Sequence, residues 1–378
     1  MSGSADASLL PAPRSPLTVL IAGGGTGGHL MPALAIAASL RASHPQWRVV
    51  LAGAERGVEA TLLPTRDFPY ALLPAEPIYR RQWWKNLRWP FLAIRLIREV
   101  DALLDRESPA VVVGTGGYAS GPVVWRAARR GIPTAIQEQN AYPGVATRWL
   151  AKRVREVWLG IPETRRHLSP GPRTAVLDTG TPITRPDPGR EAAAIQRFGL
   201  DPGRPVLLVT GGSQGALAIN DAIARWIASG GAEGLQILWA TGRTSYDRFR
   251  AQHAPPAVHV FDFLDPMADA YAVATLAISR SGMMTVAELA AWGIPSILVP
   301  LPTAAADHQT ANARVLADAG AAIHLSQAEF PAALWSGKLV PGLLGSPDRL
   351  AAMATAARAR GRPDAAAQIS ARIGILSG

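Results

Sequence analysis

Two glycine-rich segments, one in each half of the chain, have the composition of phosphate-binding loops. Residues 23–29 read GGGTGGH, and residues 211–216 read GGSQGA. Each segment follows a short apolar stretch and precedes one rich in Ala, Leu and Ile, which is the order of strand, loop and helix N-terminus. Backbone amides and the helix dipole attract anions at such a junction. The sequence therefore predicts two nucleotide-type units with a ligand held between them.

His29 ends the first of these loops, and its position suits a proton acceptor. A histidine at a helix N-terminus has a lowered pKa, so its imidazole is neutral near pH 7 and can take a proton. A hydrogen-bonded histidine with a structural role is the alternative. Glu138 is the second candidate base, because residues 137–140 (QEQN) place four polar side chains where a strand ends. Such side chains belong in a crevice at the carboxyl edge of a parallel sheet.

A third glycine cluster, residues 114–122 (GTGGYASGP), also follows an apolar stretch. Its amides could form another anion-binding concavity, which would suit a diphosphate, and ordinary turn formation explains the pattern equally well. A dinucleotide is disfavoured because the acid that would bind its ribose, expected about 20 residues after the loop, is missing. Residues 45–50 (PQWRVV) contain no acid, and the first one is Glu55.

In the second half, residues 279–288 (SRSGMMTVAE) follow another apolar stretch. Arg280 could offset the charge of an anionic leaving group. Glu288, about one helical turn into the next helix, could accept hydrogen bonds from two ribose hydroxyls. A structural salt bridge for Arg280 and a favourable first-turn acid for Glu288 are the alternatives. Residues 302–312 (PTAAADHQTAN) add further polar side chains beside a strand end.

A cluster of tryptophan and basic residues stands apart from these loops. Its members are Ile78, Arg80, Arg81, Trp83, Trp84, Lys85, Arg88, Trp89 and Phe91. Tryptophan rings and guanidinium groups suit the headgroup region of an anionic bilayer. We favour this membrane patch over a buried aromatic cluster. A nucleic-acid surface ranks last, because no nucleic-acid-binding signature accompanies the cluster.

Composition narrows the function classes. The 378 residues are too many for one ordinary domain, and the 48% hydrophobic content indicates a sizeable core. The absence of cysteine excludes disulfides, thiolate zinc sites and cysteine nucleophiles. The net charge of +10, almost all from arginine, favours an anionic partner. No apolar run reaches the ~18–20 residues of a membrane span, and the first residues lack signal-peptide features, so we expect a cytosolic protein.

The elements that must position these residues alternate between strand and helix patterns, which predicts an α/β fold with doubly wound parallel sheets. We expect a disordered tail over residues 1–16, an N-terminal domain over 17–178 and a C-terminal domain over 179–349. A helical stretch at about 350–378 is expected to complete the first domain. The predicted strands are 19–22, 48–52, 111–113, 134–137, 157–159, 206–209, 236–241, 258–261, 276–279, 296–300 and 322–324.

Taken jointly and in this order, the motifs resemble the MurG family of glycosyltransferases. The matching segments are residues 23–29 with Pro32, 114–122, 138–140 with 143–144, 211–216 with 219–220, 279–288 and 308–312, within about residues 17–325. The resemblance implies a GT-B fold, in which two Rossmann-like domains face a cleft. It implies transfer of GlcNAc from UDP-GlcNAc to lipid I (undecaprenyl-pyrophosphoryl-MurNAc-pentapeptide), giving lipid II of peptidoglycan synthesis.

The same resemblance implies a peripheral protein on the cytoplasmic face of the bacterial plasma membrane, with no cofactor, no metal and no nucleic-acid partner. It assigns the N-terminal domain to the acceptor and the membrane, and the C-terminal domain to UDP-GlcNAc. Glu288 would bind the ribose, the Leu264 backbone the uracil and Gln309 the sugar. The other implied substrate-binding residues are Thr26, Gly27, Gly28, Asn140, Thr184, Arg185, Ser213, Arg280, Met283, Met284, Thr285 and His308.

Three positions depart from the family pattern. Gln137 stands where the family commonly has His, so no proton transfer can be assigned to it. Thr184 occupies the place of an arginine that contacts the donor region, and Arg185 follows one position later. Thr147 replaces a frequent asparagine.

The implied reaction is attack of a muramyl 4-hydroxyl on the anomeric carbon with inversion, while UDP leaves. His29 is our candidate base, with Glu138 as its rival. Three alternatives stay open: a glycolipid hexosyltransferase of the same fold, a UDP-sugar epimerase, and an inactive nucleotide-sugar-binding scaffold. An oxidoreductase is disfavoured.

Overall fold

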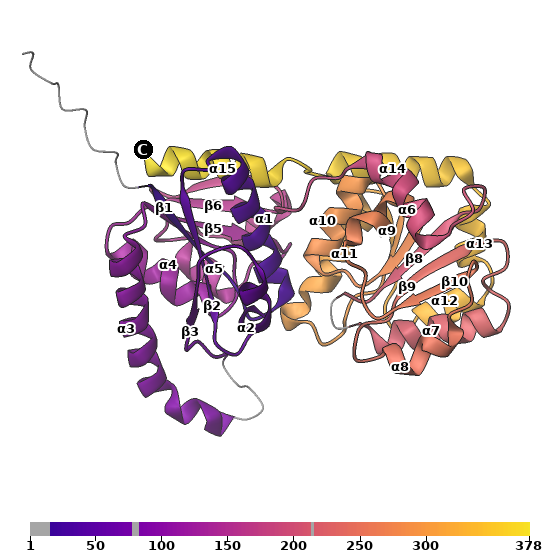
Figure 1. The fold of residues 1–378 in the computed structure, drawn as a ribbon, viewed down its shortest axis with the longest axis horizontal. Coiled ribbons are helices and arrows are strands. Elements are labelled where there is room, and N and C mark those ends of the chain that lie inside the picture. The colour runs from indigo at the N-terminus through magenta and orange to yellow at the C-terminus, as the bar shows by residue number, and fades with distance from the viewer. Residues whose placement is uncertain (1–15, 78–82, 213–214) are drawn as a thin grey trace, which may run out of the picture.

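The computed structural model describes residues 16–77, 83–212 and 215–378. Two α/β domains lie side by side, each built on one parallel sheet (Figure 1). This arrangement confirms the predicted fold class. Four of the predicted site residues lie outside the described residues, namely Ile78, Arg80, Arg81 and Ser213. Most of the predicted N-terminal tail lies outside them as well.

The N-terminal domain has a seven-stranded sheet in the order β3-β2-β1-β4-β5-β6-β7, with parallel neighbours throughout. Its central strands are unbroken apolar runs such as TVLIA and VVVG, as expected for parallel strands covered on both faces. The strands are β1 (Thr18–Ala22), β2 (Arg48–Ala54), β3 (Tyr70–Leu73), β4 (Val111–Gly114), β5 (Thr134–Glu138), β6 (Glu156–Leu159) and β7 (Ala175–Asp178).

Helices cover both faces of this sheet. α1 and α15 pack on one face, and α3, α4 and α5 pack on the other. The helices of this half are α1 (Gly27–Ser43), α2 (Glu59–Leu62), η1 (Leu63–Thr65), η2 (Trp83–Arg88), α3 (Trp89–Glu107), α4 (Ser120–Arg129), α5 (Val145–Leu150) and η3 (Pro162–His167). The sequence did not predict β3 and β7, because each is a four-residue edge strand with partly exposed side chains and therefore a weak apolar signal.

The C-terminal domain has a six-stranded parallel sheet in the order β10-β9-β8-β11-β12-β13. Its strands are β8 (Val206–Thr210), β9 (Gln236–Ala240), β10 (Val258–Phe261), β11 (Leu276–Ser279), β12 (Ser296–Leu298) and β13 (Ala322–His324). The helices are η4 (Pro188–Arg190), α6 (Glu191–Phe198), α7 (Leu217–Ala228), α8 (Tyr246–Phe249), η5 (Arg250–Gln252), α9 (Met267–Val273), α10 (Met283–Trp292), η6 (Ala305–Asp307), α11 (His308–Asp318), α12 (Phe330–Trp335) and α13 (Leu339–Leu344).

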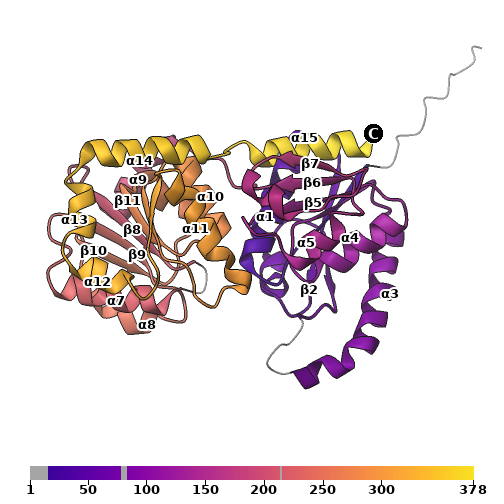
Figure 2. The ribbon, with the colours of Figure 1, turned by 180° about the vertical axis from the view of Figure 1, so that it is seen from behind.

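The last two helices connect the domains. α14 (Pro347–Arg360) packs against α10, and α15 (Ala365–Ser377) crosses to the N-terminal domain and packs against α1 (Figure 1, Figure 2). Ile369 and Ile373 of α15 are fully buried in the N-terminal core. Arg372 adds an ion pair to the buried Glu156 of β6, with its Nε 3.1 Å from Oε2. The chain end thereby fastens to the domain in which the chain begins.

Strand order reverses next to β1 in one sheet and next to β8 in the other. At such a point the loops after neighbouring strands diverge and leave room for a ligand at the carboxyl edge. In the N-terminal domain these are the loops after β1 and β4, and in the C-terminal domain those after β8 and β11. All four are segments in which the sequence predicts chemistry.

Candidate functional site between the two domains

The glycine loops after β1 and β4 are packed backbone against backbone. The Gly24 amide donates to the Gly116 carbonyl at 3.3 Å. Gly117 has φ +82°, and a Cβ there would lie 1.7 Å from the Gly24 oxygen. Only glycine fits such an approach, because any side chain would separate the two loops. The glycines therefore serve to join the loops, in addition to any contact with a ligand.

A buried carboxylate that sequence reasoning missed holds the first loop from behind. Glu59, at the start of α2, has no exposed surface. Its Oε1 accepts hydrogen bonds from the amides of Gly25 and Ala54, the latter at 3.2 Å. The Gly25 amide points at this carboxylate, so it is not available to an outside anion. No sequence signal marked Glu59, because an acid early in a short helix is common.

His29 lies in the first turn of α1 and is half-buried. Its Nδ1 is 3.1 Å from the Thr26 hydroxyl, and its ring packs where a Gly116 side chain would be. Burial lowers its pKa below 6.5, and the charge of His308 in the other domain lowers it further, while Glu138 opposes the shift. The lowered pKa agrees with the prediction, but burial is the main cause. The imidazole is neutral at pH 7 and able to accept a proton.

Glu138, the rival base, is buried at the end of β5 and its carboxylate is saturated with donors. Oε1 accepts from the backbone amide of Asn140 at 3.1 Å and from its side chain at 3.2 Å. Oε2 accepts from the Gly144 amide at 3.0 Å and the Thr147 hydroxyl at 2.7 Å. Thr147 thus makes use of its hydroxyl where the family frequently has asparagine. A carboxylate with four donors is better suited to hold this turn in place than to act as a base, because a proton bound to it would displace donors.

Gln137, the departure next to Glu138, is fully enclosed. It has no exposed surface, and within the described part of the chain neither its Nε2 nor its Oε1 has a hydrogen-bond partner. An enclosed amide without partners costs about 1–3 kcal/mol. The side chain therefore neither stabilises the strand through hydrogen bonds nor reaches a ligand.

Asn140 brings the two domains into contact. Its Oδ1 accepts a hydrogen bond at 3.2 Å from Asn312 on α11, and the Ala141 amide donates to Asn312 Oδ1 at 2.9 Å. Within the C-terminal domain, the Ser281 hydroxyl donates to the Gln309 carbonyl at 2.8 Å. The loops after β5 and β11 and the first turns of α11 therefore form one connected group. Sequence reasoning grouped Asn140 with the site and did not single out Asn312.

Arg280, directly after β11, is buried and held by neutral acceptors. It donates to the carbonyls of Val299 and Pro300 at 3.1 and 2.9 Å, and to Gln327 Oε1 at 2.7 Å. Burial lowers the pKa of Arg280 from its ordinary value, but a guanidinium remains charged at neutral pH. The expected alternative, a salt bridge, does not occur within the described residues. Its charge therefore persists without a carboxylate to cancel it.

Glu288 lies in the second turn of α10 and has one donor, the hydroxyl of Tyr271 on α9, at 2.8 Å. The position corrects the alternative of a first-turn acid. Burial raises the pKa of Glu288 to about 7, although the bond from Tyr271 opposes that shift. Tyr271 itself has a raised pKa because it is buried beside this carboxylate. Glu288 is half-buried and retains acceptor capacity for hydroxyl groups.

The other predicted contacts fall into four locations. Met284, Thr285 and Met283 form the first turn of α10, with Met283 lining a cavity between the domains near Leu159 and Arg360. His308 and Gln309 begin α11, and Gln309 Oε1 accepts the Leu301 amide at 2.9 Å.

Leu264 is buried in the loop after β10. Thr184 and Arg185 are exposed in the segment between the domains, where Arg185 lies 3.5 Å from Asp364. This ion pair directs the arginine toward the linker before α15.

Part of the predicted membrane patch is exposed. Phe91 is 80% exposed and Trp84 54%, and the neighbouring Leu87, which was not in the predicted patch, is 71% exposed. Trp89 is half-buried, and Arg88 pairs with Glu76. For Trp83 and Lys85 the side chains are not described. The first turns of α3, with η2, extend past the rest of the domain (Figure 1, Figure 2).

Sequence reasoning missed two further tryptophans, one on α4, which packs against α3, and one on α5. Trp149 on α5 is 46% exposed and lies 6.3 Å, centroid to centroid, from Trp125 on α4. Arg153 lies over Trp149 at 4.2 Å, and Arg129 over Trp125 at 5.3 Å. These rings and guanidinium groups are far apart in sequence from the η2 cluster, so no local pattern could link them.

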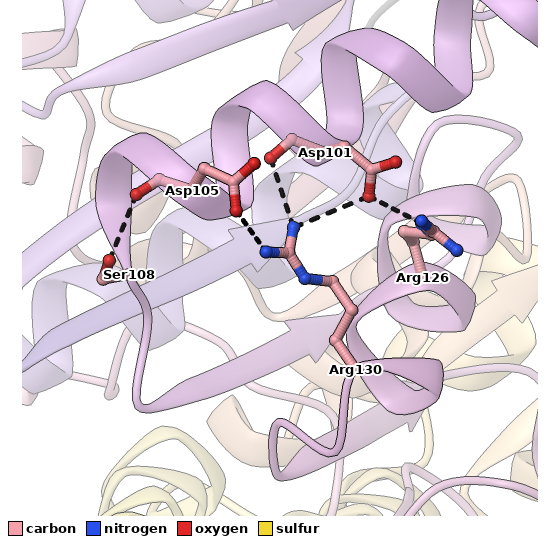
Figure 3. Close-up of polar contacts among 5 residues, drawn as sticks. All are labelled: Asp101, Asp105, Ser108, Arg126 and Arg130. Atoms are coloured by element: carbon pink, nitrogen blue, oxygen red, sulfur yellow. Dashed lines mark hydrogen bonds and ion pairs between the residues drawn. The ribbon is translucent and has the colours of Figure 1, made fainter.

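Ion pairs fix α3 to α4. Figure 3 shows the guanidinium of Arg130 between Asp101 and Asp105, with Arg126 on the other side of Asp101. Arg126 donates to Asp101 at 2.6 Å. This partly exposed network lies along the second half of α3, where Val100 and Leu104 pack into the core. The exposed first turns of α3 therefore belong to a helix whose second half is held by ion pairs to Arg126 and Arg130.

Two features are absent from the described residues. None of the helices there combines the length and apolar content needed to span a bilayer. No group of three or more His, Cys, Asp or Glu side chains there is arranged to hold a metal ion.

Comparison with known proteins identifies the family. The model of the glycosyltransferase family 28 N-terminal domain matches residues 19–159, and that of the C-terminal domain matches residues 206–369. A UDP-N-acetylglucosamine--N-acetylmuramyl-(pentapeptide) pyrophosphoryl-undecaprenol N-acetylglucosamine transferase from Carboxydothermus hydrogenoformans is 39% identical over 344 residues. That match covers 89% of this chain and 92% of the relative.

A transferase of the same name from Salinibacter ruber is 41% identical over 360 residues, covering 93% of this chain and 95% of the relative. Among solved structures, Acinetobacter baumannii MurG matches with a TM-score of 0.73 and 30% identity, covering 95% of this chain and all of that one. The sheets, the loops at their carboxyl edges and these matches agree, and the chain belongs to glycosyltransferase family 28 and, within it, to the MurG family.

Proposed function

We propose that this protein transfers GlcNAc from UDP-GlcNAc to the muramyl 4-hydroxyl of lipid I, with inversion at the anomeric carbon, and so forms lipid II. The relatives that match nearly the whole chain are named for this transfer. The observation that carries the proposal in the site itself is His29, a histidine in the first turn of α1 whose pKa is lowered by burial and also by the charge of His308 in the other domain. A transferase that joins two bound substrates needs such a base between them.

His29 is the proposed base. The attacking hydroxyl must lose its proton as its oxygen bonds to the anomeric carbon, and a neutral imidazole within reach can take it. A hydrogen bond from Nδ1–H to the Thr26 hydroxyl would leave Nε2 as the acceptor. Glu138 would then have a positioning role, holding Asn140 and the turn after β5.

The C-terminal domain is the proposed donor site. UDP leaves with its diphosphate charge, which the N-termini of α7 and α10 and the uncancelled charge of Arg280 can stabilise. Glu288 would accept the two ribose hydroxyls. The Leu264 backbone would meet the uracil, and Gln309 the sugar. Met283, Met284, Thr285 and His308 would line this pocket, with Ser213 at the phosphate; Thr26, Gly27, Gly28 and Asn140 would face it.

We further propose that the protein attaches peripherally to the cytoplasmic face of the plasma membrane through α3, α4 and α5. The exposed side chains Phe91, Leu87 and Trp84 suit the acyl boundary, and the arginines beside Trp125 and Trp149 suit lipid phosphates. The anchored half of α3 would keep this surface fixed relative to the acceptor side of the cleft (Figure 3).

A transfer assay tests the function. Purified protein is incubated with labelled UDP-GlcNAc and a short-chain lipid I analogue, and the disaccharide product and free UDP are measured. Parallel reactions with diacylglycerol as acceptor, or with no acceptor and a test for epimerised sugar, probe the two enzyme alternatives. Product only with diacylglycerol, or only an epimer, would overturn the proposal, and no product in any arm would favour a binding scaffold.

Vesicle flotation tests the membrane attachment. Phe91→Asp should weaken binding to phosphatidylglycerol vesicles by roughly 10- to 100-fold, the equivalent of one large apolar side chain lost from the interface. Ile375→Asp is the matched control, because Ile375 is also exposed but lies on α15. Equal binding by Phe91→Asp and the native protein would contradict the assignment of this surface.

A further inference from the structure

Asn312 forms a polar bridge between the domains. It is fully buried on α11 of the C-terminal domain. Its Oδ1 accepts the Ala141 backbone amide at 2.9 Å, and its Nδ2 donates to Asn140 Oδ1 at 3.2 Å. The same Nδ2 also donates to the Ser281 carbonyl at 3.3 Å, within its own domain. One amide group therefore satisfies two loops that belong to different sheets.

Glu138 in the N-terminal domain determines which group donates and which accepts in each of these hydrogen bonds. Glu138 offers only acceptors when ionised, so Asn140 must turn its Nδ2 toward Glu138 and its Oδ1 toward the other domain. Asn312 must then present Nδ2 to Asn140 and Oδ1 to the Ala141 amide. Rotating either amide by 180° would set two acceptors or two donors against each other. The chain of bonds from Glu138 to Asn312 accordingly has one polarity.

Asn312 is also connected to the proposed sugar-binding end of α11. It follows Gln309 by three residues, which places both on neighbouring positions of the helix. Ser281 links the two, since its hydroxyl donates to the Gln309 carbonyl and its own carbonyl accepts from Asn312. A displacement of the first turn of α11 is therefore transmitted directly to Asn140.

We propose that Asn312 is a positioning residue for glycosyl transfer, which sets the Asn140 loop and through it Glu138 in register with the donor domain. The inference rests on the proposed function, since the reaction needs groups from both domains at one centre. Asn312 touches no reacting atom in this account. Asn312 holds the Asn140 loop in place only while the two domains are in contact. If the domains separated, Asn312 could no longer reach Asn140 and Ala141.

Asn312→Asp is the sharpest test. The carboxylate keeps the shape and still accepts the Ala141 amide, but it faces the Asn140 and Ser281 oxygens without a proton to donate. We expect kcat with the lipid I analogue to fall on the order of 100-fold, the effect of a small misplacement at a reaction centre. The dissociation constant for UDP should stay within about twofold, because the proposed uridine contacts lie elsewhere in the donor domain.

Asn220→Asp is the matched control. Asn220 is a buried helix asparagine whose Nδ2 donates to the Thr241 carbonyl at 2.8 Å and whose Oδ1 accepts Trp239 Nε1 at 3.0 Å. The same substitution makes the same polarity error there, but within the C-terminal domain alone. It should lower thermal stability without a selective loss of kcat.

Two structural readouts do not depend on activity. Amide hydrogen exchange over residues 139–145 should rise in Asn312→Asp, and small-angle scattering should report a larger radius of gyration. Asn220→Asp should show neither change. Asn312→Ala, which removes the bridge without adding charge, should give the same pattern in a weaker form and serves if the Asp variant fails to fold.

The outcomes separate two kinds of failure. Native kcat in Asn312→Asp, an equal loss of UDP affinity, or the same pattern in Asn220→Asp would each overturn the bridge. A native protein that transfers no sugar would overturn the proposed function instead. The exchange and scattering measurements would still decide whether Asn312 holds the domains together.

Discussion

The carboxylates of the two domains have opposite hydrogen-bonding environments. On the N-terminal side, Glu138 is saturated by four donors and Glu59 is bound to the glycine loop. On the C-terminal side, Glu288 has one tyrosine donor and a pKa of about 7, and Arg280 carries a charge that no carboxylate cancels. Glu138 and Glu59 are bound by neighbouring groups of their own domain, whereas Glu288 and Arg280 retain capacity for a ligand.

This difference indicates a division of labour. A saturated network fixes geometry, because each donor and acceptor specifies the position of the next. An under-satisfied carboxylate and an uncancelled guanidinium are poised to gain from a ligand that brings hydroxyls and negative charge. We therefore expect substitutions of Glu138 and its donors to affect turnover and stability, and substitutions of Glu288 and Arg280 to affect UDP affinity.

The largest expected effect comes from His29. His29→Ala should lower kcat by about 10²–10⁴-fold, the usual contribution of a general base, and leave UDP affinity unchanged. Its pKa is lowered from 6.5, so the native rate should fall as pH drops through a value below 6.5. His44→Ala is the control, because His44 stacks on Trp47 beyond the other end of α1. Near-normal turnover in His29→Ala would exclude this base.

Glu138→Gln tests whether Glu138 holds the turn after β5 in place or acts as the base. An amide nitrogen in place of either oxygen would face two of the four donors, so the free energy of unfolding should fall by about 1–3 kcal/mol in denaturant melts. Glu138 raises the pKa of His29, so removing its charge should move the acid limb of the pH–rate profile to lower pH. If Glu138 were the base, the limb would disappear instead.

UDP affinity should depend on pH through Glu288. The carboxyl has a raised pKa of about 7, so it is protonated below that pH and ionised above it. If the ionised form accepts the ribose hydroxyls, calorimetry should show affinity rising about tenfold between pH 6 and pH 8. The same titration with Glu288→Gln should be flat over that range. Affinity that falls as pH rises would contradict a carboxylate contact.

The smallest expected effect is that of Tyr271→Phe. The tyrosine hydroxyl lowers the pKa of Glu288, so its loss should raise that pKa and weaken UDP binding at pH 7 by about two- to fivefold. Affinity at high pH should be close to native, where the carboxylate is ionised in both proteins. A uniform loss at all pH values would indicate a packing defect rather than a change in titration.

Much of this could be predicted from local sequence. The central strands β1, β4, β8 and β11 are mostly apolar, and each leads into a glycine-rich or polar turn to which the sequence analysis assigns chemistry. The edge strands β3 and β7 could not be predicted, because partial exposure dilutes the apolar pattern. The predicted C-terminal helix proved to be two helices, since residues 361–364 carry the chain from one domain to the other.

The sequence alone determined the two-domain parallel fold, the four loops at the carboxyl edges and His29 as candidate base, because those depend on patterns within a few residues. Only the tertiary structure decided that Glu59 holds the first loop, that Glu138 is saturated and that Asn312 reaches Asn140 across the cleft. Such roles depend on hydrogen-bond partners that lie up to 172 residues away in sequence. Donor and acceptor capacity is a property of a residue type, but whether that capacity is used is decided by which groups the fold brings within about 3 Å.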